Sequence, residues 1–346
     1  MFPQGDLGGI GPEVLLQTLG RADLRAICHP LIVGQLKSLR AIADQCGIDC
    51  ELEPAATEAS SSNLFARPEN APIPVLELEA TATDDRPGAA SASFGLAAVE
   101  AVLRSGAMCL AGKADGMVTP PLSKASMHAA GYSFEGQTQI IGELCGSRRY
   151  GMLACNGELK VLLATRHMAL REAIDKLEIG AVVKQLRIAH EAAREVLGLE
   201  DPRIALAALN PHASENGAFG NEEKKILKPA IKRAHQEFGF KTAGPEVPDV
   251  VFMDGADGKW DIIVALYHDQ GFIPLKFAGR AKAWTLFVGG EILRTSPMHG
   301  TAWDIVRTGK ADPAPFAYAL ERCVELANGR ISSSCSKVST NATTTS

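Results

Sequence analysis

Three histidines, His167, His212 and His268, each follow an apolar run of the kind that forms a buried strand. In open α/β sheets, ligands bind at the carboxyl ends of the strands. Neutral imidazoles are good ligands for a divalent metal, and a site with three of them keeps a position open for substrate. An isolated histidine is more often a surface or core residue, but three at equivalent strand ends raise one shared metal site to a hypothesis beside that reading.

Further reactive groups lie in the sequence after the third histidine. Asp269 follows His268 directly, and Lys276 lies farther along the loop that is expected there. Asp269 and Lys276 are both candidates for the catalytic acid or base. Lys276 and Arg294 are candidates for binding a carboxylate or phosphate group of a substrate, although either cation could equally be solvated. If the three histidines share a metal and the cations face it, these residues indicate metal-assisted chemistry on an anionic substrate.

The elements that must position these residues alternate between strands and helices. Apolar strand patterns recur along the chain, and stretches of helical periodicity, such as residues 179–197 and 222–238, separate them. This alternation predicts an α/β fold with largely parallel strands. Asn156 and Gly157, between two apolar runs, predict an additional antiparallel hairpin.

The composition is that of an ordinary globular protein. The chain has 346 residues, of which 46% are hydrophobic and 22% are charged, and its formal net charge is -5. This length favours two lobes over one. The lack of a basic tract argues against a nucleic-acid partner, and no apolar run approaches the roughly 18 residues of a membrane span. The eight cysteines form no CxxC pair, which favours free thiols in the cytoplasm.

The two ends of the chain carry separate expectations. Residues 5–13 form a glycine-rich turn that is expected to lead into a helix. Such turns normally follow a strand, and because only four residues precede this one, the N-terminal strand is expected to be missing. Residues 331–346 are mostly Ser, Thr, Asn and small residues, which predicts a disordered tail after a folded region of residues 1–330.

Four motifs taken together resemble the 4-hydroxythreonine-4-phosphate dehydrogenase (PdxA) family. They are the glycine-rich turn ending in Gly-Pro-Glu, Leu-Asn-Pro-His-Ala at residues 209–213, Tyr-His-Asp-Gln-Gly at 267–271, and Arg-Thr-Ser with His-Gly-Thr-Ala at 294–302. The similarity covers about residues 5–328. It implies an isocitrate-dehydrogenase-like fold, which is a three-layer α/β/α arrangement with two lobes around a central cleft. It also implies an NAD-dependent dehydrogenase that forms a homodimer, with its metal site near the interface.

The resemblance also implies roles for individual residues. The residues that match the family's metal ligands are His167, His212 and His268. The residues that match its substrate contacts are Thr138, Lys276 and Arg294. The residues that resemble an adenosine-binding loop for the cofactor are His299, Gly300 and Thr301. Histidine ligands suit zinc best, with magnesium, manganese and cobalt as alternatives. The implied reaction oxidises a secondary alcohol with NAD, and the resulting β-keto acid then loses carbon dioxide.

Two candidate substrate-binding positions depart from the family pattern. Gln137 stands where the family has a histidine, and an amide cannot carry a proton or a positive charge near pH 7. Thr285 stands where the family has a substrate-binding asparagine. Unchanged metal ligands beside changed substrate contacts predict the same chemistry on a related substrate. We expect a hydroxy acid phosphate, such as 4-hydroxythreonine 4-phosphate or a four-carbon sugar-acid phosphate.

Three alternatives remain open from the sequence. The first is a dehydrogenase of an unphosphorylated dihydrodiol carboxylate in aromatic catabolism. The second is a catalytically weakened descendant that binds a ligand or partner without turning it over, which the changed Gln137 and Thr285 would allow. The third is an α/β acyl- or phosphotransferase of similar sheet architecture, which the complete set of histidines argues against.

Overall fold

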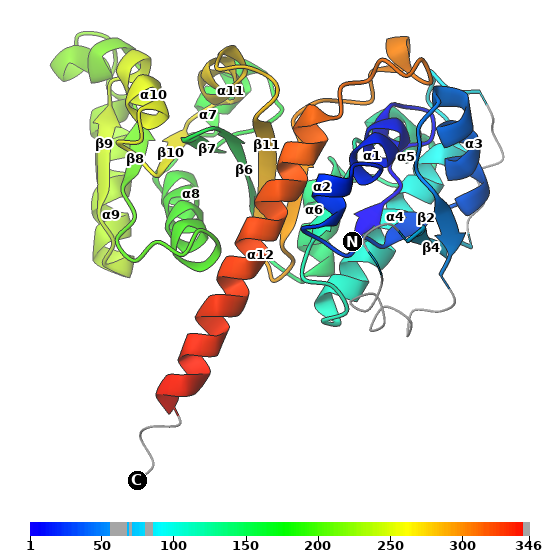
Figure 1. Ribbon diagram of the computed structural model, residues 1–346. Coiled ribbons are helices and arrows are strands. Elements are labelled where there is room, and N and C mark those ends of the chain that lie inside the picture. Colours follow the sequence, from blue (N-terminus) through cyan, green and yellow to red (C-terminus); the bar gives the residue numbers. More distant parts are fainter. Residues whose placement is uncertain (56–67, 69–70, 80–85, 342–346) are drawn as a thin grey trace. The chain divides into compact units, whose positions relative to one another are not determined.

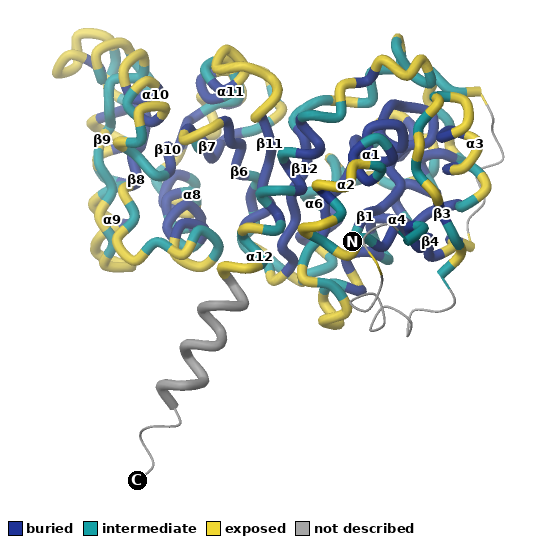
Figure 2. Tube along the Cα trace, viewed as in Figure 1, coloured by how far each residue is buried: buried dark blue, intermediate teal, exposed yellow. Residues whose placement is uncertain are grey.

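The computed structural model describes residues 1–55, 68, 71–79 and 86–341, with side chains up to residue 329. The described chain divides into two compact units. Unit 1 contains Met1–Arg148 and Gly290–Ser346, and unit 2 is the continuous stretch Arg149–Gly289. Each unit has its own buried strands and covering helices (Figures 1 and 2).

Unit 1 contains a parallel sheet with strand order β1-β2-β4-β3. Its strands are β1 (Phe2–Pro3), β2 (Ile32–Gly34), β4 (Ile73–Glu77) and β3 (Leu52–Pro54). Two further strands of this unit, β5 (Met117–Val118) and β12 (Arg294–Pro297), pair in parallel with Arg294 beside Met117.

The N-terminal strand, which the sequence suggested was missing, is present as β1. Phe2 pairs with Ile32 and Pro3 with Val33, and both β1 residues are buried. The expectation was wrong because two residues are enough to join an existing parallel sheet. The Val118 N–H also donates to the Met1 carbonyl oxygen at 3.0 Å, which fixes the start of the chain from a second direction.

The helices of unit 1 surround this core. They are α1 (Gly11–Leu19), α2 (Ala22–Arg25), α3 (Leu36–Cys46), α4 (Ala92–Leu110), α5 (Lys124–Ala129), α6 (Gln137–Leu144), the 3-10 turn η5 (Trp303–Ile305) and α12 (Ala314–Asn341). Helix α4 contacts β1 and β2, while α1 contacts α3 and α12.

By length and composition α4 could cross a membrane, although no such span was expected from the sequence. More than half of the apolar stretch of α4 is buried inside unit 1, as expected of a core helix.

The C-terminal tail differs from the disorder expected for residues 331–346. Helix α12 continues to Asn341, and residues 342–346 lie outside the described part of the chain. Nucleation is the costly step of helix formation, whereas each added residue brings one more hydrogen bond. Phe316 and Leu320 are buried in unit 1 and fix the first turns, so the polar stretch extends a helix that already exists.

Unit 2 contains strands in the order β11-β6-β7-β10-β8-β9. They are β11 (Ala283–Val288), β6 (Gly151–Asn156), β7 (Leu159–Leu163), β10 (Ile262–Ala265), β8 (Ile204–Ala207) and β9 (Thr242–Glu246). The predicted hairpin is confirmed, because β6 and β7 are antiparallel with Asn156 opposite Leu159. Strands β7, β10, β8 and β9 are mutually parallel.

Helices cover both faces of these strands, so the predicted α/β/α layering is confirmed. On one face, Ile188 of α8 (Ile179–Glu191) packs near Gly151 of β6, beside Leu162 of β7. On the other face, Gly271 of α11 packs against Val161 and Leu163. Successive residues of a strand point to opposite faces, which explains how neighbouring positions of β7 reach two helical layers. The remaining helical elements of unit 2 are α7 (Leu170–Asp175), η2 (Ala192–Val196), η3 (Pro211–Gly217), η4 (Glu223–Leu227), α9 (Lys228–Phe238), α10 (Pro248–Ala256) and α11 (His268–Phe277).

His190 of α8 is a buried histidine with a structural role. Only 4% of its surface is exposed, and its ring stacks on Phe240 with 3.8 Å between centroids. Its Nε2 lies 3.0 Å from the Lys241 carbonyl oxygen, to which the neutral ring donates a proton. Burial lowers the pKa of His190 to about 4, so the ring is neutral at pH 7.

This buried histidine predicts a loss of stability in mild acid. In the unfolded chain the imidazole has a pKa of roughly 6.5, so between that value and the folded pKa only the unfolded state takes up the proton. Lowering the pH from 7.5 to 5 should therefore reduce the free energy of unfolding by about 2 kcal/mol through this residue alone. Urea unfolding of the wild type and of His190→Gln at both pH values measures the effect. An equal loss in both proteins would contradict it.

Candidate metal and substrate sites

The three candidate metal ligands follow three neighbouring strands of unit 2. Strand β10 pairs in parallel with β7 on one side and with β8 on the other. The carboxyl ends of all three strands therefore lie at the same edge of the sheet. His167, His268 and His212 come after the ends of β7, β10 and β8, respectively. The structure thus places all three histidines at the strand ends that the sequence indicated.

His167 and His268 lie next to each other. Their ring centroids are 5.3 Å apart, with 43° between the ring planes. The Nδ1 of His268 is 2.7 Å from Asp269 Oδ1, so in the neutral ring it donates its proton to this carboxylate and leaves Nε2 as an acceptor. Metal-binding histidines are commonly oriented in this way by a carboxylate on the other nitrogen. Asp269 therefore acts on His268 in this structure.

Gln270 connects two of the strand ends. Its Oε1 accepts a hydrogen bond from the Leu266 N–H, and its Nε2 donates one to the Ala208 carbonyl oxygen, both at 2.7 Å. Leu266 directly follows β10 and Ala208 directly follows β8. The amide side chain is buried and pairs two backbone groups that lie beyond the regular ladder of the sheet. It therefore holds the chain segment before His268 beside the segment that leads to His212.

Replacing Gln270 with leucine should destabilise unit 2 by about 2–4 kcal/mol, because two buried backbone groups lose their partners. Urea unfolding of the purified protein measures the loss. Gln236→Leu is a matched control, since Gln236 is exposed in the same unit and the same side chain is exchanged. A Gln270→Leu protein as stable as this control would rule out the bridge as a stabilising contact.

His212 lies in a strained segment. Five consecutive residues from His212 to Asn216 have φ between 43° and 70°, the left-handed region that non-glycine residues rarely adopt. Such strain persists only where the surroundings enforce it, and it concentrates at functional sites.

Among the described residues, no three His, Cys, Asp or Glu side chains are grouped closely enough to hold a metal ion. The complete set of three histidine ligands thus stays a prediction.

Glu223 anchors the chain immediately before this strained segment. Its Oε1 accepts hydrogen bonds from the N–H groups of Leu209 and Asn210 at 2.9 and 2.8 Å. Its Oε2 accepts from Asn210 Nδ2 at 2.9 Å, and Glu222 accepts from the same nitrogen at 2.8 Å. Glu223 is almost completely buried, so these hydrogen bonds compensate for removing its charge from water.

The other two candidates of unit 2 occupy contrasting positions. Lys276 is exposed near the end of α11, and its Nζ lies 5.8 Å from the centre of the Phe272 ring. Thr285 is buried in β11, where it pairs with Ala154 of β6. An exposed ammonium group is available to a ligand, whereas Thr285 lies within a strand that is hydrogen-bonded along its length.

In unit 1, Arg294 is a buried guanidinium group. Its Nε donates to Thr119 Oγ1 at 2.8 Å, and its Nη2 donates to Gln137 Oε1 at 3.3 Å. Gln137 in turn donates to the Pro120 carbonyl oxygen at 2.8 Å. Burial lowers the pKa of Arg294 to about 9, which still leaves it positively charged at pH 7. Thr138 follows Gln137 at the start of α6, and of these two candidates Gln137 is the one that contacts Arg294.

The candidate cofactor residues also lie in unit 1, beside the glycine-rich turn. The Ile10 N–H donates to the Thr301 carbonyl oxygen at 2.9 Å. A Cβ atom on Gly9 would lie 2.7 Å from the Cβ of Thr301, so the contact requires glycine. Gly300 lies between Thr301 and His299, whose pKa is lowered by burial.

Three buried polar atoms of this loop have no hydrogen-bond partner in the described part of the chain. They are His299 Nε2, Trp303 Nε1 and Arg307 Nε. Buried polar groups are normally paired, so unpaired groups in one loop indicate a place for a bound molecule. This observation is compatible with a nucleotide cofactor, which offers many hydrogen-bonding groups.

Sequence reasoning missed the residues that hold these groups in place. Gln270 and Asn210 lie inside the recognised motifs, but only the neighbouring histidines were given a role. Glu223 and Thr119 lie outside the motifs, and no local pattern distinguishes them from ordinary polar residues.

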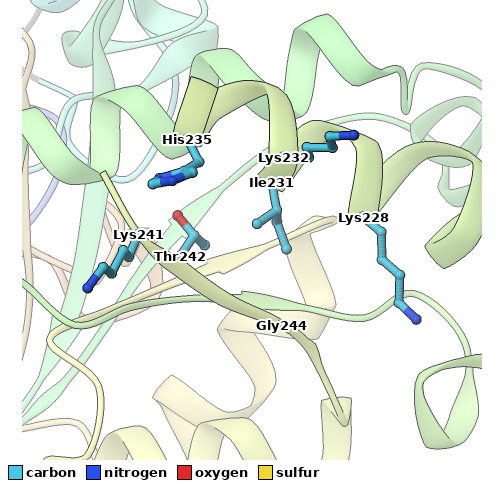
Figure 3. A pocket seen from close by; sticks show the side chains of 7 residues that line it. All are labelled: Lys228, Ile231, Lys232, His235, Lys241, Thr242 and Gly244. Atoms are coloured by element: carbon cyan, nitrogen blue, oxygen red, sulfur yellow. The ribbon is translucent and has the colours of Figure 1, made fainter. Parts of the chain in front are cut away.

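A separate hollow lies between α9 and β9 in unit 2. It has a volume of about 340 Å³ and is lined by Lys228, Ile231, Lys232, His235, Lys241, Thr242 and Gly244. His235 and Thr242 face each other, while the three lysine ammonium groups point in different directions around the rim (Figure 3). Because the cations do not converge, the hollow offers no preformed anion site. None of the predicted site residues lines it.

The fold is that of an α/β protein with reactive side chains after the ends of its parallel strands, and comparison with known proteins identifies the family. The model of the family described as "Pyridoxal phosphate biosynthetic protein PdxA" matches residues 26–323. A 4-hydroxythreonine-4-phosphate dehydrogenase of Beijerinckia indica is 38% identical over 326 residues, covering 93% of each chain. A D-threonate 4-phosphate dehydrogenase of Salmonella typhimurium is 37% identical over 326 residues, covering 93% of this chain and 97% of that protein.

A solved structure supports the same conclusion. The 4-hydroxythreonine-4-phosphate dehydrogenase of Klebsiella pneumoniae matches with a TM-score of 0.83 and 34% identity, covering 94% of this chain and 97% of that one. The protein belongs to the PdxA family, as its motifs predicted. The predicted enzyme class, a dehydrogenase acting on a CH–OH group, is confirmed.

Proposed function

We propose that this enzyme uses NAD and a divalent metal to oxidise a four-carbon hydroxy acid phosphate, with D-threonate 4-phosphate as the leading candidate and 4-hydroxythreonine 4-phosphate as the second. The relatives named for these two substrates are nearly equally similar to this chain, so identity alone does not separate them. The observation on which we base the preference for D-threonate 4-phosphate is the hydrogen bond between Arg294 and Gln137. It puts a neutral amide beside the candidate anion-binding cation, at a position where the family has histidine.

Arg294 is suited to bind the phosphate or carboxylate group of such a substrate. A buried guanidinium is costly unless anions or hydrogen bonds compensate for it. Thr119 and Gln137 supply neutral hydrogen bonds, and they fix the plane of the guanidinium group. A planar, oriented guanidinium can bind an oxyanion through two parallel hydrogen bonds.

His167 and His268 are the residues that would hold the metal, together with His212 as the resemblance assigns. The adjacent imidazole rings and the carboxylate on Nδ1 of His268 support this assignment. When bound, a divalent cation would polarise the substrate hydroxyl group and stabilise negative charge on oxygen. Asp269 is occupied with orienting His268, which makes Lys276 the better candidate for proton transfer.

The loop of His299, Gly300 and Thr301 would hold the adenosine half of NAD. Buried polar atoms without partners among the described residues, at His299 in this loop and at Trp303 and Arg307 just after it, support a bound molecule there. When bound, NAD would supply the acceptor for the hydride of the alcohol carbon, and the protein would provide placement and electrostatics. We further propose that the β-keto acid formed in this way loses carbon dioxide.

Exposed apolar side chains support the expected homodimer. Phe277 and Ile273 of α11 are 92% and 65% exposed, and Met253 of α10 is 63% exposed. Ile273 and Phe277 are four residues apart and so lie on one face of α11, and α10 contacts this helix. Large exposed apolar side chains grouped in this way mark protein interaction sites. Lys276 also lies on α11, which would place it near the second copy.

The seven described cysteines are free thiols, which supports a cytoplasmic enzyme.

NADH formation provides the test of this proposal. D-threonate 4-phosphate, 4-hydroxythreonine 4-phosphate and an unphosphorylated dihydrodiol carboxylate would each be assayed with and without added zinc, magnesium, manganese or cobalt. We expect turnover of the phosphorylated acids, with D-threonate 4-phosphate preferred, and dependence on the metal. Full activity in metal-stripped protein would exclude the metal, and turnover of the dihydrodiol alone would favour the alternative substrate class.

Replacing His268 with alanine should lower kcat/KM by at least about a hundredfold and weaken zinc binding, because a metal ligand is removed. The fold should remain, since the ring is at the surface edge of its unit and only partly buried. Zinc titration and circular dichroism accompany the activity assay. His235→Ala is the matched control, because His235 is an exposed histidine of the same unit. Equal zinc affinity in both variants would remove His268 from the proposed site.

Gln137→His should shift preference toward 4-hydroxythreonine 4-phosphate by roughly tenfold or more, as expected when one polar contact to the substrate changes. The ratio of kcat/KM for the two phosphorylated acids measures the shift. An unchanged ratio in a folded, active variant would show that Gln137 does not determine specificity.

A further inference from the structure

Glu13 is a buried carboxylate that contacts a distant part of the sequence. It lies in the first turn of α1 and is 1% exposed. Its Oε2 accepts a hydrogen bond from the Arg307 N–H, and its Oε1 accepts one from the Ala311 N–H, both at 3.2 Å. A buried charge of this kind is retained where hydrogen bonds compensate for its desolvation.

The segment of residues 299–311 is thus fixed to the N-terminal region at two places. Thr301 contacts Gly9 and Ile10, and the segment from Arg307 to Ala311 is held by Glu13. All of these residues belong to unit 1.

The backbone between the two attachments is strained. Ala302 and Arg307 have φ of 42° and 57°, which non-glycine residues rarely adopt. The same segment carries the buried atoms His299 Nε2, Trp303 Nε1 and Arg307 Nε, which have no partner among the described residues. A strained backbone with unpaired polar groups needs external contacts to keep its shape.

We propose that Glu13 is a positioning residue that holds residues 299–311 in the conformation that binds the adenosine half of NAD. This inference rests on the proposed use of NAD by the loop of His299, Gly300 and Thr301. The carboxylate acts through the backbone of the loop, without touching the cofactor. Its two oxygens match two N–H donors, so an amide at this position would turn one acceptor into a donor.

The test compares Glu13→Gln with the wild type. We expect the Kd for NAD and for AMP, measured by isothermal titration calorimetry, to rise roughly tenfold or more, because a hydrogen bond to a charged group is lost at the loop. The KM for NAD should rise by a similar factor, while kcat at saturating NAD stays within about twofold. Zinc affinity should remain that of the wild type, since the candidate metal ligands lie in the other unit.

Two further variants separate positioning from a general effect on folding. Glu51→Gln removes the same charge from an exposed site of unit 1 and should leave AMP binding unchanged. Gly9→Ala should raise the Kd for AMP without involving Glu13, because its new Cβ would meet Thr301 at 2.7 Å and displace the other attachment.

The outcomes are distinguishable. A folded Glu13→Gln protein that binds AMP and NAD as tightly as the wild type overturns the positioning role, as does an equal loss of kcat and of NAD affinity. If Glu13→Gln does not fold, Glu13→Asp is measured instead, because the shorter carboxylate cannot reach both N–H groups, and unchanged AMP affinity in this folded variant overturns the role. If the wild type itself binds neither AMP nor NAD, the proposed cofactor is wrong and this inference falls with it.

Discussion

The side chain of Gln270 connects two strand ends of unit 2 that lead to the candidate metal ligands His268 and His212. Parallel strands place their carboxyl ends at one edge of the sheet, but backbone pairing stops before the functional residues begin. Beyond that point a side chain must replace the ladder, and Gln270 does so with one donor and one acceptor. An amide is an uncharged side chain that carries its donor and its acceptor on two separate atoms, so it can pair with two groups at once. The relative placement of the segments before His268 and His212 therefore depends on this residue.

Buried polar side chains play the same part elsewhere in the molecule. Glu223 holds the chain before the left-handed turn of His212, and Glu13 holds the loop that follows Thr301. In each case a carboxylate accepts hydrogen bonds from backbone N–H groups that have no partner within a helix or strand. Thr119 and Gln137 fix Arg294 by hydrogen bonds to its guanidinium group. Loops that keep an unfavourable backbone conformation are thus stabilised by buried side chains that are not themselves candidates for catalysis.

Much of the fold could be predicted from the sequence because it follows from local patterns. Apolar runs marked β7, β8 and β10, and Asn156 with Gly157 marked the hairpin. The two-residue β1 and the helix that begins at His268 could not be found in this way, because each depends on neighbours that are distant in the sequence. The same limit applies to the site. The reactive histidines were visible as residue types at strand ends, whereas Glu223 and Glu13 become recognisable only through their backbone partners.

If Arg294 binds the substrate anion as proposed, specificity is most readily changed at the groups that surround this cation. On the proposed function, altering a metal ligand would remove the chemistry for every substrate, so those positions would be constrained as a set. A residue that only hydrogen-bonds the cation, as Gln137 does with Arg294, can change without loss of the charge itself. Exchanging histidine for glutamine there removes a group that titrates near neutral pH and leaves a neutral one. The expected consequence is a different preference for the polar groups beside the phosphate or carboxylate, with the oxidation step retained.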